Sequence, residues 1–311
     1  MKYLGKGAFY KSIEFIRRNA RPLEKSYLKY LFFGGNEKSV LNELGQFQND
    51  DGGFGNAIEP DIRMPFSSPI STSVGVRHLM EFDKNRRARK MIEAAIKYFE
   101  ASFNEDRDGW FALDRRVNDY PHAPWWHFDE ERGKTVIDEN WGNPTAEIVA
   151  YVYKYYQYAS KLNVEDLIDY SLKRLINKKE FNSENEVYCY IKLYEVLSGE
   201  RKNKITEQLS RAIEQVIVYD SSRWYEYVPK PLDIVESPEK QRFSIPDNKI
   251  NENLDFIINL LEEEGKIEPP WGQSFYTDDM KSAYKEWQGI LTLKALKILN
   301  DFERLDQVSI L

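Results

Sequence analysis

Apolar residues recur along this chain at the spacing of one helical face. Near the N-terminus Phe9, Ile13 and Ile16 fall on one side of a helix, and segment 205–216 repeats the pattern. Segment 291–299 is apolar nearly all round, which predicts a fully buried helix. Few segments alternate strictly between apolar and polar residues over more than four positions, so we expect an all-α protein with little or no β-structure.

The predicted helices are joined by a recurring connection. A helix ends in an acidic turn with an aromatic residue, usually with glycine; a loop with several prolines follows, and then a second helix begins. The turns are residues 46–55 (QFQNDDGGFG), 104–111 (NEDRDGWF), 219–227 (YDSSRWYEY, where the pattern is degraded) and 262–275 (EEEGKIEPPWGQSF). Second helices are predicted over 71–82, from Thr145 on and over 280–299, and a unit with a shortened turn over 164–177 and 184–197. Units of about 50 residues are typical of repeat proteins, in which helix pairs bury their apolar faces against neighbouring pairs.

The turns themselves have a structural interpretation. Gly52 and Gly53 permit a tight turn with positive φ, and Asp50 can accept a hydrogen bond from the backbone of that turn. The aromatic residues of the turns are expected to pack against the helices: Phe54, Trp110 and Trp224. We favour packing over catalysis for these turns.

The first of these repeats resembles the repeat of squalene–hopene cyclases and protein prenyltransferase β-subunits. QFQNDDGGFG, the prolines after it and STSVGVRHL carry the resemblance, and EWQGILTLKALKIL at 286–299 is similar to a final inner helix of that family. The resemblance implies a single α/α-toroid domain over residues 1–311, with concentric inner and outer helices and a ligand cavity at the N-termini of the inner helices. Only residues 48–55 match closely, and the fold hosts unrelated activities.

Composition narrows the class of partner. The formal net charge of −7 argues against nucleic acid, and we interpret the basic segment 84–90 as solvated surface. No apolar run reaches the roughly 20 residues of a membrane span, and the N-terminal segment lacks an apolar signal core. We therefore expect a cytoplasmic protein without a membrane span. The resemblance to the cyclase repeat implies that its partner is an apolar small molecule.

The metal and acid motifs of the related enzymes are missing. Prenyltransferases bind zinc through Asp, Cys and His, but Cys189 lies in an apolar helix with no histidine after it, so we expect a small core residue and neither metal nor cofactor. As the only cysteine, it cannot form an intrachain disulfide. Class II cyclases use an Asp-x-Asp-Asp acid; the nearest segment here has Asp278 and Asp279, with Tyr276 in place of the first Asp. These two acids either donate a proton or cap the following helix, and we favour the cap.

Residues 121–148 form the second candidate region, because a long connection dense in Trp and His tends to line a site. His127 beside Asp129 could act as acid or base, and Glu147 either caps its helix or points into the cavity. Together with the acids Glu59 and Asp61, which precede the first inner helix, this region completes the set of candidates. The catalytic candidates are Asp278, Asp279, Asp138, Glu139 and His127; the ligand-binding candidates are Glu59, Asp61, Trp125, Trp126, Trp141, Glu147 and Trp271.

These residues leave three functions open. The first is a cyclase-like protein that binds, and as an enzyme acts on, an apolar or isoprenoid molecule in a central aromatic cavity. The second is a carbohydrate-active lyase or hydrolase, in which Trp stacks on sugar rings and two carboxylates react. The third is a non-catalytic binding or scaffold protein. The missing motifs favour the third function, and the Trp- and His-rich region favours the first two.

Overall fold

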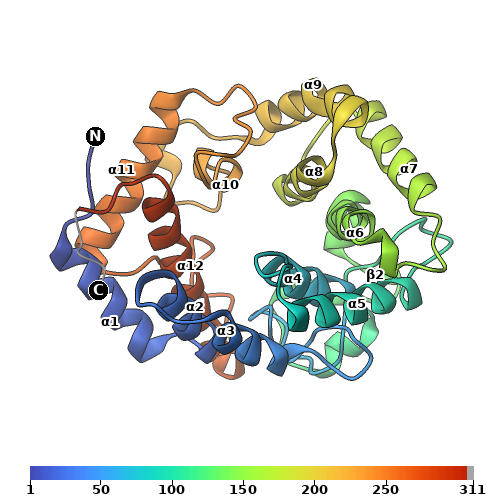
Figure 1. Cartoon of the computed structure of the whole chain (residues 1–311), viewed down its shortest axis with the longest axis horizontal. Helices are drawn as coiled ribbons and strands as arrows, with labels where there is room; N and C mark the ends of the chain where they lie inside the picture. Colours follow the sequence, from blue (N-terminus) through green and yellow to red (C-terminus); the bar gives the residue numbers. More distant parts are fainter. Residues whose placement is uncertain (307–311) are drawn as a thin grey trace. The chain divides into compact units, whose positions relative to one another are not determined.

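A computed structural model of the chain describes residues 1–306, and 61% of these residues are helical (Figure 1). The only sheet in this part of the chain is a hairpin of two short strands, β1 (Phe128–Asp129) and β2 (Lys134–Thr135). The predicted all-α class is therefore confirmed. Across the described residues, no helix is both long and apolar enough to cross a membrane. The helices fall into two compact units, residues 44–216 and residues 1–43 with the chain from 217 on. Closure of all helices into one toroid stays a prediction.

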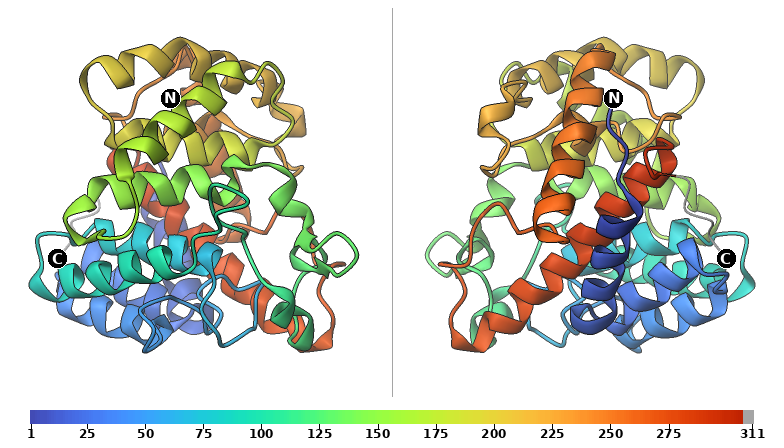
Figure 2. Two further views of the ribbon diagram at one scale, coloured as in Figure 1. Left: turned by 90° about the vertical axis from the view of Figure 1, so that its right-hand side faces the viewer. Right: turned by 90° about the vertical axis from the view of Figure 1, so that its left-hand side faces the viewer.

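The unit of residues 44–216 consists of two layers of helices (Figure 1). One layer holds α4 (Pro69–Met80), α6 (Gly142–Lys154) and α8 (Glu184–Val196); the other holds α5 (Arg86–Ala101), α7 (Val164–Asn177) and α9 (Gly199–Val216). Helix α6 packs against both α4 and α8, and each of these three contacts the helix that follows it in the chain. In the left view of Figure 2, α5, α7 and α9 follow one another from bottom to top. This arrangement is the predicted repeat of helix pairs.

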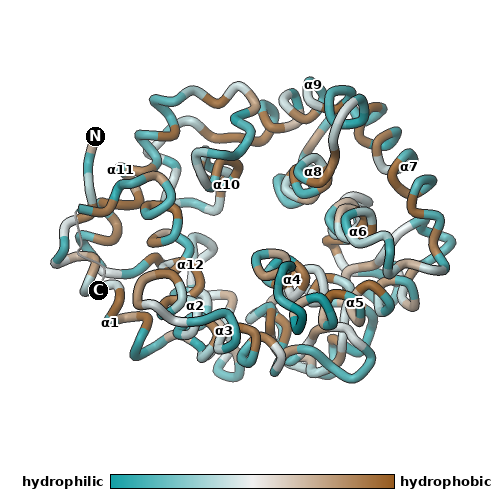
Figure 3. Tube along the Cα trace, viewed as in Figure 1, coloured by the Kyte–Doolittle hydropathy of each residue, from teal (hydrophilic) through white to brown (hydrophobic). Residues whose placement is uncertain are grey.

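Burial differs between the two layers because their sequences differ. Every residue from Gly142 to Val152 of α6 is buried, whereas α5, α7 and α9 bury one face and expose a charged one (Figure 3). A helix between two neighbours and an outer helix has little contact with water, so it tolerates few charges. Charged side chains that do occur on the layer of α4, α6 and α8 therefore need specific partners.

The other unit combines both ends of the chain. Its helices are α1 (Lys6–Asn19), α2 (Pro22–Phe32), α3 (Glu37–Leu44), α10 (Pro231–Ile234), α11 (Asp247–Glu264) and α12 (Lys281–Asp301). Helix α12 packs against α1 and α2, and α11 packs against α1 (Figure 2, right). A backbone bridge between Leu4 and Leu305 joins the first and last described segments of this unit.

One hydrogen bond recurs between the turns and the helices that follow them. A backbone N–H at or just after the turn donates to a threonine hydroxyl on that helix, and all three threonines are fully buried. The pairs are Phe54 with Thr72 (2.9 Å), Trp110 with Thr145 (3.1 Å) and Ile267 with Thr292 (2.9 Å). Because a buried N–H without a partner is costly, this bond fixes each of these turns against its helix.

The first turn is closed by Asp51, and the expectation for Asp50 was wrong. The Asp51 carboxylate accepts from the backbone N–H of Gly53 (2.9 Å) and from the hydroxyl of Ser67 (2.7 Å). A carboxylate bonds most readily to the backbone two residues further on, which is the spacing from Asp51 to Gly53. The aromatic residues Phe54, Trp110 and Trp224 are buried as expected.

Replacing Thr145 by valine should destabilise the protein. Thr145 both accepts from the N–H of Trp110 and donates to its carbonyl, so the valine leaves two buried backbone groups without a partner. We expect Thr145→Val to lower the free energy of unfolding by about 1–3 kcal/mol, measured by urea denaturation.

The control for this change is Thr206→Val. The Thr206 hydroxyl donates only to the carbonyl of Lys202 within α9 and lies at the half-buried surface. This variant should change the free energy of unfolding by less than about 0.5 kcal/mol. Equal changes in the free energy of unfolding for the two variants would show that the bond to the turn stabilises the protein no more than a hydrogen bond within a helix.

Candidate functional site

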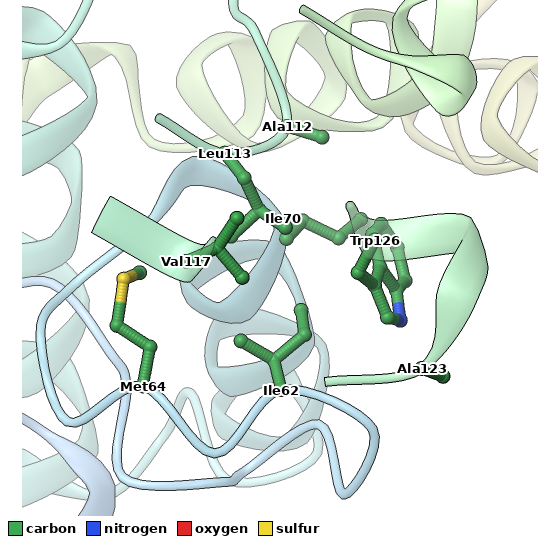
Figure 4. Packing of buried hydrophobic residues seen from close by; sticks show 8 residues of the cluster. All are labelled: Ile62, Met64, Ile70, Ala112, Leu113, Val117, Ala123 and Trp126. Atoms are coloured by element: carbon green, nitrogen blue, oxygen red, sulfur yellow. The ribbon is translucent and has the colours of Figure 1, made fainter. Parts of the chain in front are cut away.

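The two loops that precede α4 and α6 lie against each other. Ile62 and His122 pair as an antiparallel bridge, and the N–H of Ala123 donates to the carbonyl of Asp61 (3.0 Å). Their apolar side chains form a common cluster that also receives Ile70 from α4 (Figure 4): Ile62, Met64, Ile70, Ala112, Leu113, Val117, Ala123 and Trp126. The structure thus brings the region around Glu59 and Asp61 to the Trp- and His-rich loop.

Most of the aromatic surface of this loop is used in packing. Trp126, in the short helix η3 (Pro124–Trp126), is buried in the cluster beside Ile62 and Ile70 (Figure 4). Its indole Nε1 is buried without a hydrogen-bond partner. Trp125 is half-buried against the same cluster. Trp126 therefore stabilises the two loops.

His122 and His127 form a hydrogen-bonded pair at the surface of this loop. His122 Nε2 lies 3.2 Å from His127 Nδ1, and His122 Nδ1 lies 2.7 Å from the carbonyl oxygen of Tyr120. The ring centres are 5.4 Å apart with planes inclined by 15°. The distance between the ring centres is longer than the N···N distance by about two ring radii. The rings therefore lie end to end in nearly one plane, with their nitrogens facing each other.

The carbonyl of Tyr120 fixes the protonation of the pair. A carbonyl only accepts, so His122 donates through Nδ1 and, when neutral, accepts through Nε2. His127 must then donate through Nδ1, which leaves its Nε2 as an acceptor. The His127 side chain is exposed, so this nitrogen is open to solvent and to a reacting molecule. His127 thus combines an exposed side chain with a ring that its neighbours orient.

Asp138 caps a helical turn and connects it to the second turn of the repeat. Its carboxylate accepts from the N–H (3.0 Å) and hydroxyl (2.7 Å) of Thr135, forming a capping box on η4 (Val136–Glu139), and from the N–H of Ala112 (2.7 Å). Glu139 is exposed and pairs with Arg132. Both carboxylates thus have partners, and the hydrogen bond and charge of Arg132 lower the pKa of Glu139.

Glu147 is the centre of a buried ionic network on the inner layer. Arg77 of α4 donates to it through Nε and Nη2, both at 2.9 Å, and the hydroxyl of Tyr151 donates to it as well. The thiol of Cys189 on α8 lies 3.9 Å from it. Burial alone would raise the pKa of Glu147, but the charge of Arg77 and the hydrogen bonds outweigh it and hold the pKa below its usual range.

Cys189 is a buried residue, as the sequence predicted. Burial and the nearby charge of Glu147 raise the pKa of its thiol well above the usual range, so it remains protonated. Among the described residues, no three His, Cys, Asp or Glu side chains are placed to hold one metal ion.

The remaining candidates of this unit lie in two places. Glu59 and Asp61 are buried and have interaction partners. Trp141 donates through Nε1 to the carbonyl of Arg107 (3.0 Å) and packs edge-on against Tyr170 of α7. Trp141 therefore packs against α7, whereas Trp126 packs in the apolar cluster of the two loops.

In the other unit, Asp278 and Asp279 begin the short helix η7 (Asp278–Met280) before α12. Both are exposed, and Asp278 pairs with Lys281 at 2.6 Å. Thr277 is the N-cap of η7 and Met280 is the N-cap of α12, and neither helix has a side-chain cap hydrogen bond. The expectation that Asp278 or Asp279 caps the following helix was therefore wrong. The predicted cavity that joins Trp271 to Trp125, Trp126 and Trp141 draws on both units and stays a prediction.

Trp271 belongs to a group of aromatic side chains within its unit, here called the Trp271 cluster. Its indole Nε1 donates to the hydroxyl of Tyr276 (2.6 Å), and its ring packs edge-on against Trp287 of α12 (5.2 Å between ring centres) and Tyr227 (5.7 Å). Tyr276 packs in turn against Tyr284. The sequence analysis singled out Trp271 and missed the partners, because they come from three separate segments.

Glu268 is an acid of the Trp271 cluster that the sequence analysis also missed. It accepts from the hydroxyl of Tyr284 (2.9 Å) and from Nε2 of Gln288 (2.7 Å), and it pairs with Lys266. Partial burial would raise the pKa of Glu268, but these hydrogen bonds outweigh it and lower the pKa. Partial burial and the bond to Glu268 raise the pKa of Tyr284 to about 12. The cluster therefore holds an ionised carboxylate beside aromatic rings.

Replacing Glu147 by glutamine should remove a pH-dependent part of the stability. The pKa of Glu147 is lowered in the folded protein, so its contribution is present above the unfolded-state pKa and is lost as pH falls through the folded-state pKa. We expect Glu147→Gln to lower the free energy of unfolding at neutral pH by about 2 kcal/mol. This is less than for a fully buried pair, because 47% of the Arg77 side chain is exposed. In urea titrations the difference from wild type should shrink below about pH 4. A difference independent of pH would contradict the ionised network.

Nitrogen-15 NMR should show both rings of the histidine pair as Nδ1–H tautomers. The spectrum is recorded at mildly alkaline pH. His127→Ala should leave the His122 tautomer in place, since Tyr120 fixes it, and should shift the His122 Nε2 resonance. The resonances of His78 in α4 are the internal control. An Nε2–H tautomer for His127 would show that the pair does not form.

Comparison with protein-family models, with curated proteins and with solved structures gave no match. The resemblance to the cyclase repeat therefore rests on the residues that carry it, and the function has to be argued from the geometry of these sites.

Proposed function

We propose that this protein binds an apolar small molecule, of the isoprenoid type or similar to it, at the Trp271 cluster. The observation that carries the proposal is the convergence of Trp271, Trp287 and Tyr227 from three segments of the chain. Trp271 and Trp287 are only half-buried, and Tyr227 and the neighbouring Phe275 are exposed. Contiguous aromatic surface that stays in contact with water is typical of a ligand-binding site.

The polar groups of the cluster support binding of a ligand with little charge. The Glu268 carboxylate is bonded to Tyr284, Gln288 and Lys266, so it has no strong need of a further cation. The Trp287 indole N–H is buried and makes no hydrogen bond within the described structure. An apolar molecule with a single acceptor oxygen, such as an alcohol or aldehyde, would match this combination of rings and one donor.

Binding without acid catalysis is favoured by the state of the carboxylates. A catalytic proton donor needs a raised pKa or a shared proton, as in other acid-catalysed enzymes. Glu147 has the opposite, a lowered pKa, and the carboxylate oxygens of Asp138 are occupied by three hydrogen-bond donors. Asp278 is exposed beside a lysine. These observations favour the non-catalytic alternative among the functions that the sequence left open.

A second candidate, an enzyme, is supported by the histidine pair. His127 Nε2 is an acceptor open to solvent, and its ring is oriented by His122 and Tyr120. A base held in one tautomer by a second group is a common arrangement for proton abstraction. If the histidine pair is catalytic, His127→Ala should abolish turnover of a substrate that binds at this loop.

Removal of the central indole should weaken ligand binding. We expect Trp271→Ala to raise the dissociation constant for farnesol, used as an apolar probe, by about tenfold or more, because a buried aromatic contact is worth roughly 1.5–3 kcal/mol. Binding is followed by quenching of tryptophan fluorescence and by native mass spectrometry.

Tyr225→Ala is the matched control, because Tyr225 is an exposed aromatic residue of the same unit that packs on Phe256. It should leave farnesol binding unchanged. Maltose, a probe for sugar stacking, should not bind. Saturable binding of maltose that depends on Trp271 would show that the ligand is a carbohydrate and not an apolar molecule. Equal effects of Trp271→Ala and Tyr225→Ala on farnesol binding would overturn the assignment to this cluster.

A further inference from the structure

Arg107 is a buried arginine whose charge is poorly compensated. It lies in the turn over 104–111, and only 10% of its side chain is exposed. Its Nε and Nη2 atoms are buried and make no hydrogen bond. Buried guanidinium groups normally donate several hydrogen bonds, so two unpaired nitrogens on one side chain need a physical explanation.

The nearest carboxylate does not satisfy this arginine. Asp138 Oδ1 lies 3.9 Å from Arg107 Nη2, beyond hydrogen-bonding distance, and the Asp138 oxygens already accept from Ala112 and Thr135. The face of Phe111 lies 4.7 Å from the guanidinium carbon. A ring face stabilises a cation weakly and accepts none of its N–H groups in the plane.

A second arginine, Arg174, shares a neighbour with Arg107 and acts on its charge. Arg174 of α7 lies over the ring of Trp141, 4.8 Å from its centre, while the Nε1 of the same Trp141 donates to the carbonyl of Arg107. Arg174 is exposed and donates to the hydroxyl of Tyr170 (3.1 Å), which is uncharged. Trp141 thus contacts both residues: its ring packs against the Arg174 guanidinium, and its indole N–H binds the backbone of Arg107.

Glu186, an acid near Trp141, already has hydrogen-bond partners of its own. Glu186 of α8 accepts from the N–H of Gly142 (3.0 Å) and from Lys178 (2.5 Å). Burial and the charge of Arg174 lower the pKa of Arg107, and the charge of Asp138 opposes this only in part. The buried Arg107 guanidinium is therefore only partly compensated by Asp138.

We propose that Arg107 and Arg174, which both contact Trp141, form a binding site for a small oxyanion, the phosphate or carboxylate group of a ligand. An oxyanion suits the planar set of N–H donors of a guanidinium group, and it removes the repulsion between the two side chains. A water molecule would satisfy hydrogen bonds and leave the charge uncompensated. The third nitrogen of the guanidinium, Nη1, is not buried in the way that Nε and Nη2 are, and it makes no hydrogen bond. It is therefore the atom that an oxyanion from solvent would reach first.

This inference is independent of the apolar site at Trp271. The residues of the oxyanion site come from the turn over 104–111, from the N-terminus of α6 and from α7, all within the unit of residues 44–216. Failure of farnesol to bind would leave it untouched.

The test uses inorganic phosphate and acetate as probes, with chloride at the same ionic strength as the reference. Binding is measured by isothermal titration calorimetry and by the shift of the melting temperature on the full chain. We expect saturable binding of one oxyanion per chain and a higher melting temperature than in chloride. The probe with the lower dissociation constant decides between phosphate and carboxylate.

Two variants and a control locate the site. Arg107→Met should raise the dissociation constant by about tenfold or more and, in chloride alone, should melt no lower than wild type, because an uncompensated charge has been removed. Arg174→Gln, a change at an exposed residue, should weaken binding several-fold without loss of folding. Arg201→Gln removes an arginine paired with Glu165 and Asp169 and should have no effect on binding.

Two results would overturn the proposal. One is the lack of saturable binding of both probes to the wild type. The other is binding that survives in Arg107→Met and Arg174→Gln. A lower melting temperature of Arg107→Met in chloride, together with unchanged oxyanion binding, would assign Arg107 to the fold.

Discussion

The bond from a turn N–H to a buried threonine hydroxyl is the constraint on which the described architecture depends. A chain of helix pairs has to reverse direction inside the protein, and each reversal takes backbone N–H groups away from water. Thr72, Thr145 and Thr292 each accept one of these N–H groups. Because a hydroxyl on a helix can be placed only where the turn meets that helix, the bond sets both the position of the turn and the register of the helix. The proline loops then have fixed end points, and so do the side chains they carry.

Buried charge follows the same logic, with different outcomes at three places. Glu147 is matched by Arg77 and Tyr151, and the result is a network that joins α4 to α6. Asp138 is matched by amides and a hydroxyl, and it holds the second turn to the loop before α6. Arg107 is not matched, although it lies beside Asp138. A folded protein usually compensates its buried charges with its own groups, so the exception marks a place where a group from outside belongs.

The aromatic residues divide in a comparable way between packing and exposure. Trp126 and the turn residues Phe54 and Trp110 are buried, and they close the apolar layers of their unit. Trp271 and Trp287 retain contact with water beside an ionised Glu268. Burial of an aromatic ring contributes to folding, whereas a ring that is left half-exposed can contribute to binding, since its remaining surface can still be removed from water.

The sequence by itself determined the helices, their pairing and the packing role of the turn aromatics, because these depend on local periodicity and on short turns. The helices predicted over 164–177 and 184–197 are α7 and α8 almost to the residue. Only the tertiary structure decided which charged and aromatic side chains meet. Arg77 and Glu147, or Trp271 and Tyr227, lie on different elements, and no spacing along the chain encodes their contact. The same acid can cap a helix or serve a site, and the difference lies in the neighbours that the folded chain brings to it.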